Sequence, residues 1–231
     1  MEGFRFVDIF ATKGIEYIIV MAFLAAFIYF TRYLAYRPSA EKREEPAGSM
    51  GYFRIPEGLF YHQGHGWLRP EPDSDSIGVV GMDDFAHKLV GPVDAVELPG
   101  VGTRLAQGDK AWSLVVGSVK IPMLSPVDGE VVAVNPEALR SPAVLGADPY
   151  GKGWLFKVRS PRIAADLRNL LSGNLARAWM ENALGTLHPM NPVQLGPVLQ
   201  DGGLPVEGLA RILGGDRWDE MARTHLLTGG E

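Results

Sequence analysis

Several features common in enzymes and nucleic-acid-binding proteins are missing from this sequence. None of its 231 residues is cysteine, which excludes disulfide bonds, thiolate metal sites and a cysteine nucleophile. The formal net charge is −5 and no basic patch with interleaved aromatic residues is present, so no nucleic-acid partner is expected. No Gly-x-Ser-x-Gly elbow, phosphate-cradling loop or two-histidine zinc helix is found. We therefore expect a protein that is not an enzyme, and any redox chemistry would have to come from a bound or attached cofactor.

One long apolar run is present near the N-terminus. Tyr17 to Thr31 carries no charge, and with Glu16 at one end and a snorkelling Arg32 at the other it approaches the roughly 20 residues needed to span a bilayer. A cleaved signal peptide would have a shorter apolar core, and an amphipathic surface helix would have a polar face. We therefore predict a single transmembrane helix at residues 14–36, after a short leader at residues 1–13.

Charge around this run predicts an orientation. More lysine and arginine follows the run than precedes it, which favours the C-terminal side as cytoplasmic. Residues 37–50 combine proline, glycine, serine and alternating charge, as is typical of a linker. These features predict a single-pass protein of the cell (inner) membrane whose soluble domain faces the cytoplasm.

Short strand-like segments separated by turn signals occupy residues 51–160, which predicts an all-β sandwich or barrel. Asp83 is placed to cap a short helix at Asp84 to Val90. Asp128-Gly129 between two apolar runs is a strong hairpin signal, and Asn135-Pro136 is interpreted as a turn. Two further apolar runs flank a short polar tip at Gly117-Ser118.

Four ordered blocks between about Phe60 and Ser160 resemble the lipoyl domain of the glycine-cleavage H protein. The blocks are Tyr61–Arg69 with a His-x-Trp, Asp83–Asp109 with Val-Glu-Leu-Pro-x-Val-Gly, Gly108–Val132, and Asp148–Val158 with Asp-Pro-Tyr-Gly-x-Gly-Trp. The resemblance implies a barrel-sandwich hybrid of two small packed sheets. The fold class predicted for the whole chain is mainly β, lipoyl/biotinyl-like, with an N-terminal transmembrane helix and a C-terminal helical extension at residues 161–231.

In that family one lysine at a hairpin tip carries lipoate through an amide bond. The family motif is Glu-Ser-Val-Lys-Ala, and residues 117–121 of this chain are Gly-Ser-Val-Lys-Ile, which suggests Lys120 as the lipoyl lysine. However, the family's lysine lies ten positions after a glycine, here Gly108, and eight before a proline, here Pro126. Both counts end at Ser118. Placing Lys120 at the tip requires the strand register to shift by two residues. Such a shift keeps the same side chains facing the core, so Lys120 remains an alternative.

Histidine and aspartate residues offer weaker candidate sites. His62 and His65 are three apart, and His87 is the only further candidate ligand, so we expect no metal site. His65 occupies the family's His-x-Trp position, which implies a structural role. The pair Asp83-Asp84 is interpreted as a cap and a solvated charge rather than as an acid/base pair.

The C-terminal extension predicts helices with apolar stripes. The first is expected from Ile163 to Leu171, a second ends at Leu187, and a third begins at Pro205. A final helix is expected from Asp216 to Leu227, with Asp216 as its cap. These helices can pack on the β domain, form a docking surface, or do both.

Two functional hypotheses follow. The first is a membrane-anchored accessory subunit without attached lipoate, which binds a membrane protein complex or a cytoplasmic enzyme through the β domain and the C-terminal helices. The alternative is a genuine carrier with lipoate covalently attached to Lys120, which would serve as a substrate and shuttle and not as a catalyst.

Overall fold

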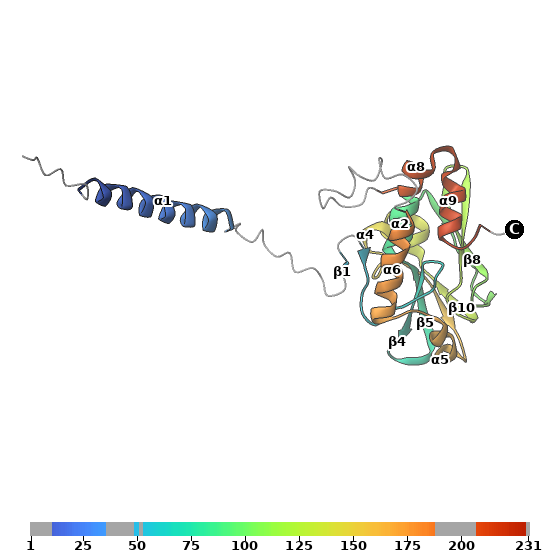
Figure 1. Cartoon of the computed structure of the whole chain (residues 1–231). Coiled ribbons are helices and arrows are strands. Elements are labelled where there is room, and N and C mark those ends of the chain that lie inside the picture. Colours follow the sequence, from blue (N-terminus) through green and yellow to red (C-terminus); the bar gives the residue numbers. More distant parts are fainter. Residues whose placement is uncertain (1–10, 36–48, 51–52, 188–206, 230–231) are drawn as a thin grey trace, which may run out of the picture. The chain divides into compact units, whose positions relative to one another are not determined.

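The computed structural model describes residues 11–35, 49–50, 53–187 and 207–229 (Figure 1). The chain divides into two units, residues 1–45 and 46–231, which are treated separately. The start of the expected leader, nearly all of the expected linker and the proposed helix start at Pro205 lie outside the described residues.

Helix α1 (Ala11–Ala35) makes up the described part of the first unit. The prediction of a transmembrane helix is wrong: across the parts of the chain that the structure describes, no helix is both long enough and apolar enough to cross a bilayer. The uncharged run Tyr17–Thr31 is about 22 Å long as a helix, short of a hydrocarbon core of about 30 Å. The prediction had extended this run with the charged residues Glu16 and Arg32. The expected location in the cell membrane, with a domain facing the cytoplasm, rested on that span and is withdrawn with it.

The second unit is built around two antiparallel sheets. The larger has the strand order β3-β4-β5-β11-β10-β7 and the smaller has the order β6-β8-β9. The expected mainly β, two-sheet part of the fold is therefore present. The strands of the larger sheet are β3 (Phe60–Tyr61), β4 (Gly66–Glu71), β5 (Ser74–Met82), β7 (Arg104–Leu105), β10 (Gly129–Val134) and β11 (Trp154–Arg159). The others are β6 (Ala95–Glu97), β8 (Lys110–Val116), β9 (Val119–Leu124) and the separate pair β1 (Ser49–Met50) and β2 (Phe53–Arg54).

The core forms because alternate strand residues point inward. In β8, Trp112, Leu114 and Val116 are buried while the residues between them are more exposed. Trp67 of β4 is fully buried, and its Nε1 donates to the carbonyl oxygens of Met82 (3.0 Å) and Pro149 (3.2 Å). The core is therefore anchored by aromatic rings on the inner faces of both sheets.

The expected Asp128-Gly129 hairpin is wrong. The strand that follows, β10, pairs with β11 and β7 of the larger sheet, whereas the preceding strand, β9, belongs to the smaller one. A Cβ atom at Gly129 (φ +144°) would lie 2.4 Å from the carbonyl oxygen of Arg159. The glycine is needed because the chain passes close to β11 as it changes sheets, and not because it turns back on itself.

Two short helices begin at side-chain caps. Helix α2 (Asp84–Val90) confirms its prediction, because the Asp83 carboxylate accepts from the backbone N–H of Ala86 at 2.8 Å. The expected turn at Asn135-Pro136 instead begins helix α3 (Pro136–Arg140), where the Asn135 side chain accepts from the N–H of Glu137. Proline is well tolerated in a first helical turn, so Asn135 and Pro136, which were expected to form a turn, instead begin a helix.

Helical segments complete the second unit. They are α4 (Val144–Ala147), α5 (Ile163–Asp166), the 3-10 helix η1 (Leu167–Asn169), α6 (Gly173–Leu187), α8 (Leu209–Gly214), the 3-10 helix η3 (Gly215–Arg217) and α9 (Trp218–His225). The last helix begins after Arg217, and Asp216 lies in η3 instead of capping it.

The C-terminal segment, residues 207–229, packs on two elements of the β domain. The N–H of Gly208 donates to the carbonyl of Lys88 at the end of α2 (2.9 Å), and a Cβ atom at Gly91 would lie 2.9 Å from the Cα of Gly208. Helix α9 lies against β9, with Leu226 fully buried. This segment is thus an integral layer of the second unit.

Candidate functional site

The hairpin of β8 and β9 contains Ser118 and Lys120, the two candidate positions for lipoyl attachment. Val116 pairs with Val119, so Gly117 and Ser118 form a two-residue turn between the strands. Gly117 has φ +61°, the left-handed conformation that a tight hairpin turn needs at its first central residue. Ser118 therefore lies at the tip, exposed, in the register that the ungapped count predicts.

The tip is held from the neighbouring strand. The N–H of Gly117 donates to Oδ2 of Asp94 at 2.6 Å, and the N–H of Asp94 donates to the carbonyl of Val115 at 2.9 Å. Asp94 immediately precedes β6, so the turn is tied to the third strand of the small sheet. The Ser118 hydroxyl is thus presented on a fixed turn.

Lys120 lies on β9 and not in the turn. It pairs with Val115, and both lie on the outer face, opposite the buried Ile121. Its Nζ is 2.5 Å from Oε1 of Glu97, and 63% of the lysine side chain is exposed. Its carbonyl accepts from the Arg223 guanidinium at 2.9 Å, so α9 covers the backbone edge of β9 beside it.

The candidate histidines do not form a metal site. His65 is buried, with Nδ1 2.8 Å from Oδ2 of Asp83, whereas His87 lies against Gly146. Among the described residues, no group of three or more histidine or acidic side chains could hold a metal ion. Burial lowers the pKa of His87 and of His62, so both rings favour the neutral form.

The acidic pair has structural roles in the folded chain. Asp83 caps α2 and holds His65, while Asp84 pairs with Lys88 at 2.8 Å. The N–H of Asp84 donates to the Tyr150 hydroxyl, which in turn donates to the carbonyl of Arg54. Burial raises the pKa of the Tyr150 hydroxyl well above its ordinary value, so this hydroxyl remains a protonated donor.

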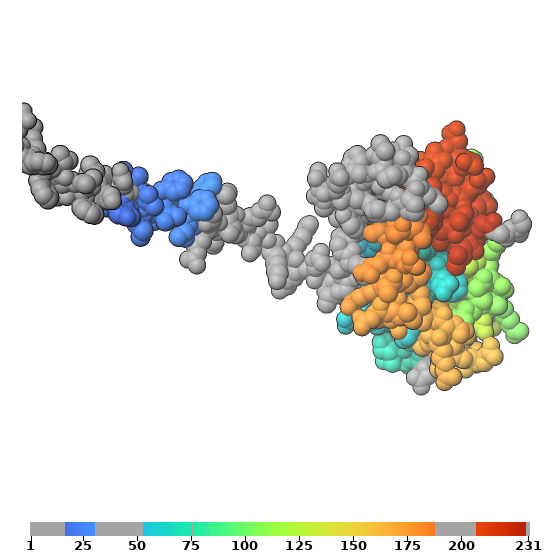
Figure 2. Space-filling model, viewed as in Figure 1, coloured from blue at the N-terminus to red at the C-terminus, as the bar shows by residue number. Residues whose placement is uncertain are grey.

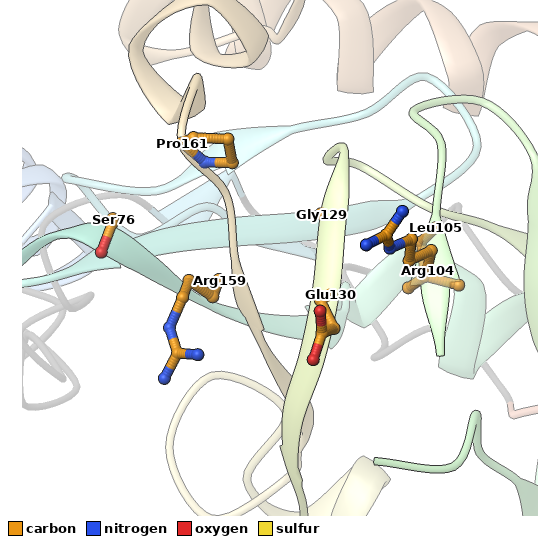
Figure 3. Close-up of a pocket in the computed structure, with 7 residues that line it drawn as sticks. All are labelled: Ser76, Arg104, Leu105, Gly129, Glu130, Arg159 and Pro161. Atoms are coloured by element: carbon orange, nitrogen blue, oxygen red, sulfur yellow. The ribbon is translucent and has the colours of Figure 1, made fainter. Parts of the chain in front are cut away.

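A cavity of about 450 Å³ lies on the larger sheet, away from the hairpin (Figure 3). Arg104 and Arg159 flank Glu130 across three neighbouring strands, as the pairing register requires. No residue of β8 or β9 lines it. Its charged residues are neighbours across the strands, and no histidine or lysine among its described lining residues could act as a base for the Ser76 hydroxyl, so we assign the candidate site to the hairpin.

A second feature of the molecule has no signal in the sequence. His65, Trp179 and His225 line one cavity, although they come from the β3–β4 turn, α6 and α9. Because they are far apart in sequence and follow no motif spacing, only the packing of α9 reveals their proximity.

The family model, the similar proteins and the similar solved structure all carry the same family description. The family model described as glycine cleavage H-protein matches residues 59–183. A glycine cleavage system H protein of Carboxydothermus hydrogenoformans is 42% identical over 120 residues, which are 51% of this chain and 88% of that protein. That of Chromobacterium violaceum is 44% identical over 119 residues, 51% of this chain and 89% of that protein. A crystal structure of an H protein from Mycobacterium marinum aligns with a TM-score of 0.43 and 30% identity, covering 46% of this chain and 87% of that one.

Proposed function

Because the chain belongs to the glycine cleavage H-protein family, we propose that it is an H-protein-like interaction module that carries no lipoate. The observation that carries this proposal is the serine at the hairpin tip. Ser118 lies between the closing pair Val116 and Val119, at the position where the ungapped count from Gly108 and Pro126 puts the family's lipoyl lysine. A hydroxyl group cannot form the amide bond through which lipoate is attached.

Lys120 is poorly placed to replace the missing amine. It lies within a paired strand, two residues beyond the tip, and its ammonium contacts Glu97. Pro122, two residues later, has no N–H to donate, which limits local rearrangement into another hairpin register. The contact from Arg223 to the Lys120 carbonyl further ties this strand to α9.

A lipoyl carrier that uses Lys120 is the second candidate. The 63% exposure of its side chain supports this alternative, because a modifying enzyme needs access to the amine. In that case the protein would be a shuttle for a group attached to its arm, as the family resemblance implies. Under either hypothesis the protein is a component that other proteins act on or bind, and not itself a catalyst.

The partner under the preferred proposal is an enzyme that binds the hairpin tip. The relatives bear the name of a multi-component system, the glycine cleavage system. Helix α9 lies close to the tip in this chain, since Arg223 donates to the carbonyl of Lys120, two residues beyond Ser118. A partner that recognises this fold can dock there without transferring a group.

Lipoylation in vitro tests the proposal. We expect a lipoate ligase with lipoate and ATP to leave the wild-type chain and Lys120→Arg unmodified, and to modify Ser118→Lys. The double variant Ser118→Lys with Lys120→Arg is the matched control, because it restores an amine at the tip alone. Intact mass spectrometry reads each result.

Modification of the wild type that disappears in Lys120→Arg would favour the second candidate. Failure of the ligase to modify Ser118→Lys, with the fold verified by circular dichroism, would show that the tip position has been misassigned.

A further inference from the structure

The C-terminal segment, residues 207–229, meets the rest of the second unit at a cavity of about 300 Å³. Figure 2 shows α6 in orange beside the C-terminal helices in red, on the same face of the molecule. The family model ends at residue 183, so the cavity wall supplied by Thr224, His225 and Leu227 lies outside the matched region. The docking of α9 is therefore a feature that the family resemblance leaves unexplained.

Apolar contacts and one hydrogen bond hold α9 in place. Ala222 and Leu226 are fully buried, and the helix lies against β9. The Arg223 guanidinium donates to the carbonyl of Lys120 at 2.9 Å. Because β9 is an outer strand of the smaller sheet, α9 covers a strand edge that would otherwise be open. A Cβ atom at Gly64 would lie 3.2 Å from the carbonyl oxygen of Leu226, so the end of the segment also packs closely on the β3–β4 turn.

The junction also contains strained backbone. Across the described residues, His65 (φ +64°) and Leu227 (φ +58°) are the two positions other than glycine with positive φ, and both line the cavity. Leu227 caps the end of α9: its N–H donates to the carbonyl of Thr224, and the N–H of Thr228 donates to that of Arg223. Glycine is the usual residue at such a cap, because a side chain is disfavoured there. Strain of this kind persists only where packing enforces it, and it is common at segments that switch.

Protonation of His225 opposes the docking of α9. Its Nε2 is buried and has no hydrogen-bond partner among the described residues. An imidazolium ion carries an N–H on both nitrogens, so whichever tautomer is present beforehand, protonation leaves a buried positive charge with a donor at Nε2. Burial lowers the pKa of His225, and His65 lowers it further through its charge.

No group that faces this imidazole compensates for a positive charge on it. His65 faces it from the β3–β4 turn and is itself paired with Asp83, with 2.8 Å between Nδ1 and Oδ2. On α9, the Arg223 guanidinium is directed to the carbonyl of Lys120. The other described lining residues carry no titratable side chain: Gln63, Trp179, Asn182, Ala183, Thr186, Thr224 and Leu227. A charged His225 therefore gains no ion pair in the docked position.

A second imidazole acts on the other side of the junction. Nδ1 of His62 accepts the N–H of Gly64 at 3.0 Å, which requires that this nitrogen carry no proton. Gly64 is the residue against which the carbonyl of Leu226 lies. Burial and the charge of His65 lower the pKa of His62 as well. Protonation on either side of the junction therefore works against the docked arrangement.

We infer that the contact of α9 with β9 is a pH-sensitive switch: protonation of His225 and His62 releases the end of α9 and uncovers the edge of β9 beside Ser118. The pKa of His225 is lower in the docked segment than in a released, solvated one. The docked state is therefore favoured above the ordinary histidine pKa of about 6.5 and loses this advantage as the pH falls toward the lowered value. The inference is independent of whether the hairpin carries lipoate.

Hydrogen exchange of the full chain, read by mass spectrometry and corrected for intrinsic exchange rates, tests the switch. Between about pH 7.5 and about pH 5.0, we expect the protection of amides in residues 218–226 to fall about tenfold, because each unit by which burial lowers a pKa changes the opening equilibrium by up to about tenfold. Amides of β4 and β5 should stay more protected than those of α9 at both pH values, since α9 opens without unfolding of the sheets.

Three variants separate the causes. His225→Phe keeps an aromatic ring in place and cannot be protonated, so it should remove most of the fall in the protection of α9. Leu227→Gly relieves the strained cap, so it should raise the protection of α9 at both pH values and leave their ratio unchanged. His87→Gln removes a titrating imidazole that does not line the cavity, and as the matched control it should keep the wild-type fall.

No fall in the wild-type chain, or an equal fall in a folded His225→Phe, would overturn the switch. Amides of α9 that are as protected as those of β4 and β5 at both pH values would also overturn it, because α9 would then open only when the whole unit unfolds. The comparison of α9 with the sheets in the wild-type chain remains decisive if a variant fails to fold.

Discussion

Trp67 and Trp112 are both buried on inner sheet faces, but they differ in one hydrogen-bonding group. The Trp67 Nε1 donates to two carbonyl oxygens, whereas the Trp112 Nε1 is buried with no partner among the described residues. A buried donor without a partner loses its hydration and gains nothing in return. The two side chains should therefore respond differently to loss of the indole nitrogen.

We predict that Trp67→Phe lowers the free energy of unfolding by about 2–4 kcal/mol, and that Trp112→Phe lowers it by about 1 kcal/mol or less. Both changes remove similar ring volume, but only the first leaves carbonyl oxygens unpaired. Urea titration followed by circular dichroism measures the difference. Equal losses in the two variants would contradict the hydrogen-bond assignment.

At the scale of elements, the sequence predicts a helix or strand correctly where the deciding side-chain interaction joins residues close in sequence. Asp83 predicted the start of α2, because a cap acts within one helical turn. Gly129 was misread because the same residue type serves a tight turn and a close approach between strands. Whether Gly129 forms a tight turn or allows a close approach between strands depends on the position of β11, which is distant in sequence. The contact of α9 with β9 is likewise set by packing.

Three elements carry histidines whose charged form is disfavoured. Burial lowers the pKa of His62 in the β3–β4 turn, of His87 in α2 and of His225 at the end of α9. The unfolded chain then binds more protons than the folded chain at mildly acidic pH. Stability should therefore be greatest above the ordinary histidine pKa of about 6.5 and decline as the pH falls from there toward the lowered pKa values of the folded chain.

Urea unfolding at several pH values checks this expectation. The midpoint should fall between about pH 7.5 and pH 5.5, and the fall should be smaller in His87→Gln. A variant at an exposed turn residue, Asp73→Asn, serves as the control and should keep the wild-type pH dependence. A midpoint that rises as the pH is lowered would contradict the direction of the pKa shifts.

At the scale of the whole molecule, the sequence led to the family but not to the architecture of the N-terminus. The four blocks between Phe60 and Ser160 identified the family because they retain side chains that the sheets need, such as the buried Trp67. The predicted transmembrane helix was wrong because charged residues were counted into a run that is too short without them. The cavity of His65 and His225 was out of reach because its walls meet only in the folded chain.

The central claim is that the tip of the β8–β9 hairpin bears a hydroxyl group, Ser118, and that no lipoyl arm is attached to the protein. The most direct measurement is the intact mass of the protein purified from its natural cells, grown where other lipoyl proteins are fully modified. The account predicts the mass of the unmodified polypeptide. A mass increase equal to one lipoyl group, mapped to Lys120 by peptide fragmentation, would contradict it.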